Sequence, residues 1–124
     1  SGREYSFPGT RRLRGKRTSN ATRIVNYPIQ GFATGDIVPL ACIRALRKFR
    51  ELGLASVLVL TVHDSIVVDV HAGEREQVIQ ALRWAMTEIA ADIEERWGYT
   101  MVLPLKVEMS VGPNWGDLKE VFKG

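Results

Sequence analysis

Two apolar segments rich in β-branched residues, separated by a short polar stretch, constrain the fold of this chain more than any other feature. Residues 56–62 read Ser-Val-Leu-Val-Leu-Thr-Val, and residues 66–70 read Ile-Val-Val-Asp-Val. Such runs favour strands, because branched side chains suit a pleated, half-buried surface. Their spacing predicts a β-hairpin with His63, Asp64 and Ser65 at or beside its turn, where polar side chains stay accessible to solvent.

The segment before the hairpin predicts a helix from Pro28 to about Leu52. Its apolar side would be formed by Ile37, Leu40, Ala41, Ala45 and Phe49, and its polar side largely by Arg44, Arg47, Lys48 and Glu51. Pro28 is suited to open this helix, because the first turn does not use the N–H that proline lacks. Gly31 and Gly35 within it suggest close approach by another backbone or a ligand.

The segment after the hairpin predicts a second helix, a third strand and a short final helix. The helix lies between Gly73 and Gly98, with apolar positions at Val78, Leu82, Ala85, Met86, Ile89, Ile93 and Trp97. Apolar and polar residues then alternate over 103–109, as in a half-buried strand. Asn114 can cap a last helix that reaches Lys119. The chain thus predicts an α+β fold, in which a three-stranded antiparallel sheet of hairpin plus third strand is backed by two helices.

The first 25 residues predict a basic, loop-rich arm, apart from a possible short strand at 4–7. Residues 1–35 carry seven Arg or Lys against the single acid Glu4, a net charge of +6, whereas residues 36–124 carry ten basic and thirteen acidic residues, a net charge of −3. Both a phosphate-binding segment and a solvated tail fit this composition. We call five of these residues the basic cluster: Arg11, Arg12, Arg14, Lys16 and Arg17.

The length and composition fit one domain, with an arm at 1–25 and a folded part at 26–124. A chain of 124 residues with 45% hydrophobic content can bury one core but not two. The lone Cys42 excludes an internal disulfide and fits a reducing compartment. No apolar run approaches the ~20 residues that span a bilayer. We therefore expect a cytoplasmic protein without membrane contact.

The His63-Asp64 pair is the leading candidate for chemistry. An aspartate at a hairpin turn suits a hard cation such as Mg²⁺, which prefers one or two carboxylates together with phosphate oxygens and water. The structural alternative is a turn aspartate that bonds its own backbone. A metal phosphohydrolase built on this pair is disfavoured, because His71 is the only other histidine and such a metal cage needs several ligands.

Four motifs follow one another along nearly the whole chain. They are Gly2-Arg3 with Tyr5 and Pro8; Asn26-Tyr27-Pro28-Ile29-Gln30-Gly31 followed by the small residues 33–36; the His-Asp turn within 59–67; and 103–108 with Val111-Gly112-Pro113-Asn114-Trp115. In this order they resemble the C-terminal palm segment of family A, DNA polymerase I-like, DNA polymerases of phage or bacterial type. The second motif is similar to that family's Asn-x-Pro-x-Gln-Gly helix start, and the third to its third conserved motif.

The resemblance implies roles for four side chains. Asp64 corresponds to the second metal-binding catalytic aspartate, which holds Mg²⁺, and His63 to a residue near the primer end. Asn26 and Gln30 correspond to side chains that face the duplex minor groove. Their amides can donate to the N3 and O2 acceptors that every minor groove displays, so they can test pair geometry without reading sequence. The implied substrates are primer-template DNA and deoxynucleoside triphosphates.

The chain also departs from the family pattern. Ser65 stands where the family usually has an acid, and Thr22 stands where it usually has an arginine, with Arg23 displaced by one position. Nothing in the sequence resembles the motif with the first catalytic aspartate or the fingers helix that grips the nucleotide. A two-metal reaction needs ions on both the attacking and the leaving oxygen, which one aspartate cannot place.

We therefore expect an incomplete active site that is inactive alone and is completed by an upstream polymerase segment. The surface that this segment would cover should promote self-association of the isolated chain. The alternative hypothesis is a non-catalytic nucleic-acid-binding palm remnant that uses Asn26, Gln30 and the basic cluster without chemistry.

Overall fold

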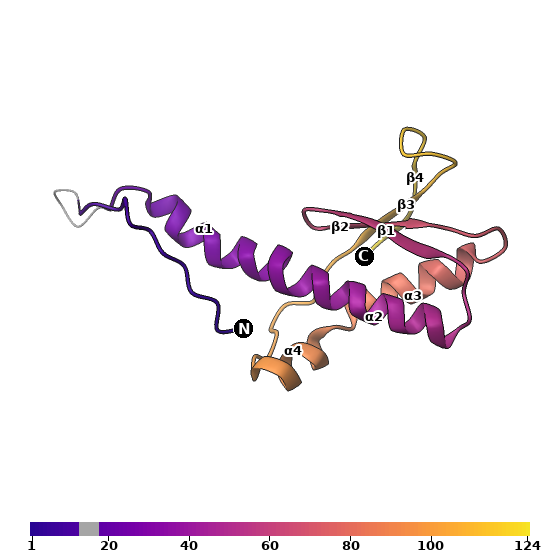
Figure 1. Cartoon of the computed structure of the whole chain (residues 1–124), viewed down its shortest axis with the longest axis horizontal. Helices are drawn as coiled ribbons and strands as arrows, with labels where there is room; N and C mark the ends of the chain where they lie inside the picture. The colour runs from indigo at the N-terminus through magenta and orange to yellow at the C-terminus, as the bar shows by residue number, and fades with distance from the viewer. Residues whose placement is uncertain (13–17) are drawn as a thin grey trace.

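The structure is a computed structural model that describes residues 1–12 and 18–124. Its helices and paired antiparallel strands confirm the predicted α+β class (Figure 1). The elements follow the order α1 (Ala21–Phe32), the π-helical turn η1 (Ala33–Ile37), α2 (Val38–Glu51), β1 (Val57–Val62), β2 (Ser65–Asp69), α3 (Arg75–Thr87), α4 (Ala90–Trp97), β3 (Glu108–Val111) and β4 (Lys119–Lys123).

One long helix, formed by α1, η1 and α2, runs along much of the molecule (Figure 1). It begins at Ala21 and not at Pro28 as predicted, so residues 21–25 of the expected loop-rich arm are helical. Asn20 precedes the helix at φ 60°, and its carbonyl accepts the N–H of Ile24 at 3.0 Å. Pro28 is tolerated inside α1 because no residue of that helix is buried, and water can reach the carbonyl that proline leaves without a donor.

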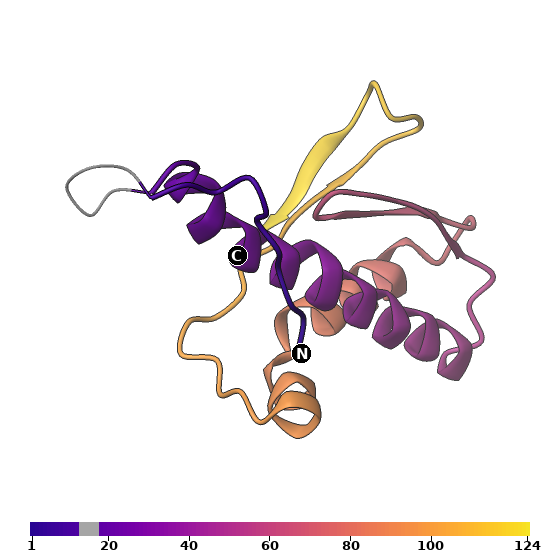
Figure 2. The same cartoon turned by 60° about the vertical axis from the view of Figure 1, so that its left-hand side comes forward.

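The N-terminal segment lies along this helix (Figure 2). Tyr5 and Phe7 meet the ring of Tyr27 edge-on, with centroids 6.5 and 5.5 Å away. A Cβ at Gly31 would collide with the Tyr5 hydroxyl, and one at Gly35 would come within 3.0 Å of the nearest guanidinium atom of Arg3. The two glycines therefore do have close neighbours, but these are side chains of the N-terminal segment and not the backbone or ligand that the sequence suggested. Residues 4–7 form no strand.

The core lies where α2 meets α3 and α4. One buried cluster joins Leu40 and Ala41 of α2 to Ile89 and Ile93, and a second joins Phe49 to Val78 and Ala81 of α3. All of these residues except Ala81 lie on the apolar sides predicted for the two helical segments. Among the described residues, no helix combines the length and apolar character that crossing a bilayer requires.

Arg44 is buried, although the sequence places it on the polar side of its helix. Only 8% of the residue is exposed. Its guanidinium donates through Nη1 to Asp92 of α4 and lies over the ring of Trp84 of α3, 4.0 Å from the centroid. Helical periodicity missed this burial because the ion pair and the aromatic face come from distant residues.

The predicted second helix is divided into α3 and α4. The break falls at Glu88 and Ile89, where Glu88 leaves helical geometry at φ −98° and ψ 34°. The apolar spacing continues through the break, so Ile89 and Ile93 still reach the core. Gly98 ends α4 at φ 64°, which confirms the predicted stop, because a left-handed residue after a helix favours glycine.

The predicted hairpin is confirmed, but the third strand does not join it. β1 pairs with β2, whereas β3 pairs with β4 in a separate two-stranded sheet. Residues 103–107 form no strand: Leu103 is 77% exposed, and Pro104 lacks the N–H that a ladder needs. The expected last helix is wrong, because Asn114 accepts bonds from Gly116 and Asp117 N–H in a turn that returns the chain as β4.

Candidate catalytic turn and nucleic-acid interface

A two-residue turn closes the hairpin and presents His63 and Asp64 to solvent. Val62 pairs with Ser65, so only these two residues lie between the strands. His63 has φ 53°, a conformation that two-residue hairpin turns favour but that most side chains avoid. The Ser65 hydroxyl donates to the Val62 carbonyl at 2.8 Å and so stabilises the turn. Both predicted catalytic side chains are exposed.

Asp64 is suited to act as one ligand of a shared metal site. Its exposed carboxylate offers the hard oxygen atoms that Mg²⁺ prefers. In residues 1–12 and 18–124, no group of three or more His, Cys, Asp and Glu side chains gathers to form a cage. His71 does not help, because it lies beyond the far end of β2, with Nδ1 4.0 Å from Glu74. Further ligands would have to come from substrate, water or another polypeptide segment.

Glu74 ties together the open end of the hairpin, opposite the turn. Its carboxylate accepts the N–H groups of Ala55 and Ser56, each at 2.9 Å, and the Ser56 hydroxyl at 2.6 Å. Ser56 Oγ in turn accepts the N–H of His71 at 2.9 Å. The Ala55 N–H is the main cause that lowers the pKa of Glu74, followed by the Ser56 hydroxyl. In the sequence, Glu74 is visible only as an acid directly after Gly73, and the spacing of apolar residues does not predict its bonds to residues 55 and 56.

Asn26 and Gln30 lie on the exposed surface of α1. They are four residues apart, so their side chains project from the same side of the helix. Nearby, Arg23 donates to the Tyr27 hydroxyl at 2.8 Å and lies over that ring. The structure therefore leaves both predicted amides open to a ligand.

The basic cluster is only partly described. Arg11 and Arg12 are exposed, and Arg14, Lys16 and Arg17 lie outside the described residues. Arg11 N–H donates to the Ser19 hydroxyl at 2.8 Å, Ser19 N–H donates to the Arg11 carbonyl at 2.9 Å, and Arg12 pairs with Thr18. These bonds hold residues 11 and 12 next to residues 18 and 19, directly before α1.

Arg3 and Asp36 form a contact that sequence reasoning missed. Arg3 Nη2 donates to Asp36 Oδ1 at 2.9 Å and to the Gly35 carbonyl at 3.3 Å. The Asp36 side chain is only 10% exposed. The Arg3 hydrogen bond lowers the pKa of Asp36. The Gly-Arg and small-residue motifs were both visible in the sequence, but nothing in either one predicted their pairing.

The structure thus presents one exposed carboxylate on a hairpin turn and two exposed amides on one side of α1. The model of DNA polymerase family A matches residues 1–117. DNA polymerase I of Chloroflexus aurantiacus is 34% identical over 114 residues, which cover 91% of this chain and 11% of that protein. DNA polymerase I of Mycobacterium leprae is 36% identical over 94 residues, or 74% of this chain and 9% of the relative.

A phage protein is similar to the same degree. The DNA polymerase of Bacillus phage SP01 is 34% identical over 96 residues, which cover 77% of this chain and 10% of the relative. No solved structure gives a significant match. The chain belongs to DNA polymerase family A. It spans only about a tenth of the length of the curated relatives that it matches.

Proposed function

We propose that this chain is the C-terminal palm segment of a template-directed DNA polymerase. It contributes one metal-binding aspartate and minor-groove contacts to nucleotidyl transfer, and an upstream polymerase segment completes the site. The observation that carries this proposal is the exposed His63-Asp64 turn between two paired strands, in a chain that belongs to the polymerase family.

The proposed role of Asp64 is to hold Mg²⁺ in the assembled enzyme. Bound Mg²⁺ would supply charge stabilisation while the primer 3′ hydroxyl attacks the α-phosphate of a deoxynucleoside triphosphate, loses its proton and displaces pyrophosphate. The short turn supports this role, because it fixes the carboxylate relative to two strands and leaves it open to DNA. His63 stands beside it and would contact the primer end.

Asn26 and Gln30 would donate their amides to the minor groove near the primer end. Their exposure on one side of α1 supports this assignment. The basic cluster directly precedes that helix and would contact phosphates. Such contacts act on every sequence alike, as a polymerase requires.

An upstream segment would cover the apolar side chains that β1 exposes. Val57, Val59, Leu60 and Val62 are between 37% and 55% exposed, which is unusual for a strand with this composition. Within the part of the chain that the structure describes, each of the two sheets has two strands, so each keeps unpaired edges. The same surface would drive self-association when the upstream segment is absent.

A non-catalytic DNA-binding palm remnant is the second candidate. Ser65 favours it, because this side chain stands at a usually acidic position and its hydroxyl already donates to the Val62 carbonyl. The open amides of α1 serve a binding module equally well.

Primer extension by a reconstituted enzyme separates the two. The chain is mixed with the upstream part of a related family A polymerase, and extension of a labelled primer is measured. Asp64→Asn keeps the shape of the turn but removes the charge that attracts Mg²⁺, so the rate should fall by about two orders of magnitude or more. Asp69→Asn is the matched control, because Asp69 is exposed at the other end of β2, opposite Val57.

DNA affinity of the Asp64→Asn enzyme should hold or rise slightly, because a carboxylate that repels phosphate is gone. Extension by Asp64→Asn at the unmutated rate would refute the metal assignment and favour the binding module.

A further inference from the structure

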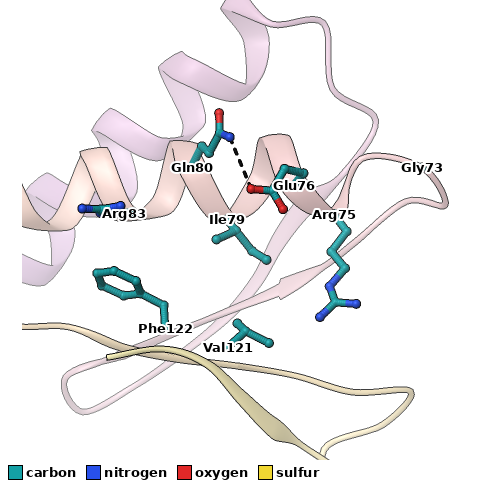
Figure 3. Close-up of a pocket in the computed structure, with 8 residues that line it drawn as sticks. All are labelled: Gly73, Arg75, Glu76, Ile79, Gln80, Arg83, Val121 and Phe122. Atoms are coloured by element: carbon teal, nitrogen blue, oxygen red, sulfur yellow. Dashed lines mark hydrogen bonds between the residues drawn. The ribbon is translucent and has the colours of Figure 1, made fainter. Parts of the chain in front are cut away.

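A groove of about 630 Å³ lies between α3 and β4, away from the hairpin turn. Figure 3 shows Ile79 of α3 and Val121 of β4 in its middle, with Arg75 at one end and Arg83 beside Phe122 at the other. The groove therefore has an apolar centre and a guanidinium at each end. Its volume lies within the range of protein binding sites, about 300–1,000 Å³.

The β4 wall of this groove lies beyond the part of the chain that the polymerase family model matches. The match ends at residue 117, and β4 begins at Lys119. β4 is nevertheless well attached: it pairs with β3, Lys123 bonds Glu108 at 2.6 Å, and Arg83 lies over the Phe122 ring at 4.6 Å. The β4 wall of the groove thus lies outside the matched range, whereas its α3 wall lies inside it.

The two arginines of the groove have free donors. Among the residues that the structure describes, neither Arg75 nor Arg83 has a carboxylate within ion-pair distance. Arg83 uses its flat face on Phe122, which leaves its in-plane N–H groups able to bind a carboxylate in bidentate fashion. The one acid of the groove, Glu76, accepts the Gln80 amide at 3.3 Å.

The spacing of these groups indicates the shape of a ligand. Arg75 and Arg83 are eight residues apart on α3, about 12 Å along the axis, with Ile79 midway. In an extended chain, the side chains at positions i, i+2 and i+4 lie on one side, and the outer two are about 13 Å apart. We propose that the groove binds an extended acidic segment of a partner protein, with two carboxylates that flank an apolar side chain at alternate positions.

Binding of an acidic segment in this groove would not require polymerase activity. A nucleic-acid strand fits less well, because its sugar-phosphate backbone would lie against the apolar centre formed by Ile79 and Val121. Glu76 weakens the binding of an acidic ligand, because its carboxylate repels other carboxylates and would attract a basic group. The two arginines outnumber this one acid in the groove.

Fluorescence anisotropy of the full chain with a labelled Gly-Ser-Glu-Thr-Leu-Thr-Glu-Ser-Gly peptide tests the proposal. We expect saturable binding that weakens at least about tenfold in the Arg75→Ala, Arg83→Ala double variant, because each guanidinium would lose a charge-assisted bond. Glu76→Gln should tighten binding. Arg47→Ala with Arg50→Ala is the matched control, because these arginines are exposed on α2 outside the groove.

Because Arg83 also stacks on Phe122, its loss can disturb β4. Arg75→Ala alone is therefore the second test, and unchanged binding by this variant overturns the proposal. It is equally overturned if no binding occurs, if a peptide with lysines in place of both glutamates binds as well, or if a single-stranded oligonucleotide binds more tightly with the same arginine dependence.

Discussion

Replacing Asp92 by asparagine should destabilise the fold more than replacing Arg44 by methionine, although both changes remove the same ion pair. Asp92→Asn leaves the guanidinium, in a residue only 8% exposed, without its paired carboxylate, with Glu88 as a more distant acid that still favours the charge. The buried Nε of Arg44 already lacks a partner among the described residues. Burial lowers the pKa of Arg44, which reflects the cost of keeping a charge there. Arg44→Met removes that charge and keeps an unbranched side chain against Trp84.

The magnitude follows from how far each partner is buried. Removing one member of a fully buried ion pair costs about 3–5 kcal/mol. The Asp92 side chain is 25% exposed, and water can partly solvate the site, so we expect about 2 kcal/mol for Asp92→Asn. Arg44→Met removes a cation–π interaction but also the desolvation cost, so about 0–1 kcal/mol is expected. Asp92 remains supported in the first turn of α4, where the helix dipole favours a negative charge.

Urea unfolding, followed by far-ultraviolet circular dichroism, measures these differences in the free energy of unfolding. The comparison holds where the variants share the same dependence of that free energy on urea concentration. The double variant should be more stable than Asp92→Asn alone, because no charge is left buried. Glu51→Gln is the control, since it removes the surface pair with Lys48 on the same helix, worth at most about 0.5 kcal/mol, and leaves Lys48 over the Trp84 ring. The reasoning is refuted if Arg44→Met costs as much as Asp92→Asn.

Three further predictions concern the hairpin base, the basic cluster and the exposed strand. The carboxylate bonds of Glu74 stabilise the fold above its ordinary pKa of 4.5, and this contribution is lost as pH falls through the lowered folded pKa. Glu74→Gln should therefore flatten the decline in thermal stability that acidification below its ordinary pKa causes, and an unchanged decline would contradict this role of the carboxylate. Neutralising the basic cluster should reduce the salt dependence of DNA binding by ~0.9 in logarithmic slope for each phosphate that the cluster neutralises, whereas an unchanged slope would identify a solvated tail. The isolated chain should form dimers or larger species by light scattering, and Val59→Thr should weaken them; a strictly monomeric chain at high concentration would count against a missing upstream segment.

The hairpin and the core were predictable because their signals are local. Branched runs around a polar pair leave few alternatives to two strands, and the apolar spacing of α2, α3 and α4 correctly marked Phe49, Val78 and Ile93 as buried. The exposure of Asp64 followed from the same short turn. These features depend on residues that are only a few positions apart in the sequence.

The errors arose where distant residues decide the outcome. Arg44 is buried only because Asp92 and Trp84 reach it from other helices. β4 is a strand because it pairs with β3. Asn114 does not cap a helix, because its side chain accepts a hydrogen bond from Gly116 within the turn. Helix α1 can begin at Ala21 because it is exposed and so tolerates Pro28. The hydrogen bonds of Glu74 form because the chain returns to residues 55 and 56 after the hairpin. The spacing of apolar residues along the sequence gives no sign of any of these features.

The π-helical turn η1 has a consequence for insertions and deletions. Each residue of an α-helix advances the direction of its side chains by about 100°. The π-helical turn closes i→i+5 bonds in place of i→i+4 bonds, so it holds one extra residue within about the same rotation. Shortening residues 33–37 by one would therefore let an ordinary α-helix continue from α1 into α2 with little change in the direction of Asn26 and Gln30 relative to the core. Removing one residue from the α-helical stretch on either side of η1 would instead rotate α1 by about 100° against α2. A lineage carrying this helix should therefore accept the loss of one residue within η1 more readily than a loss beside it.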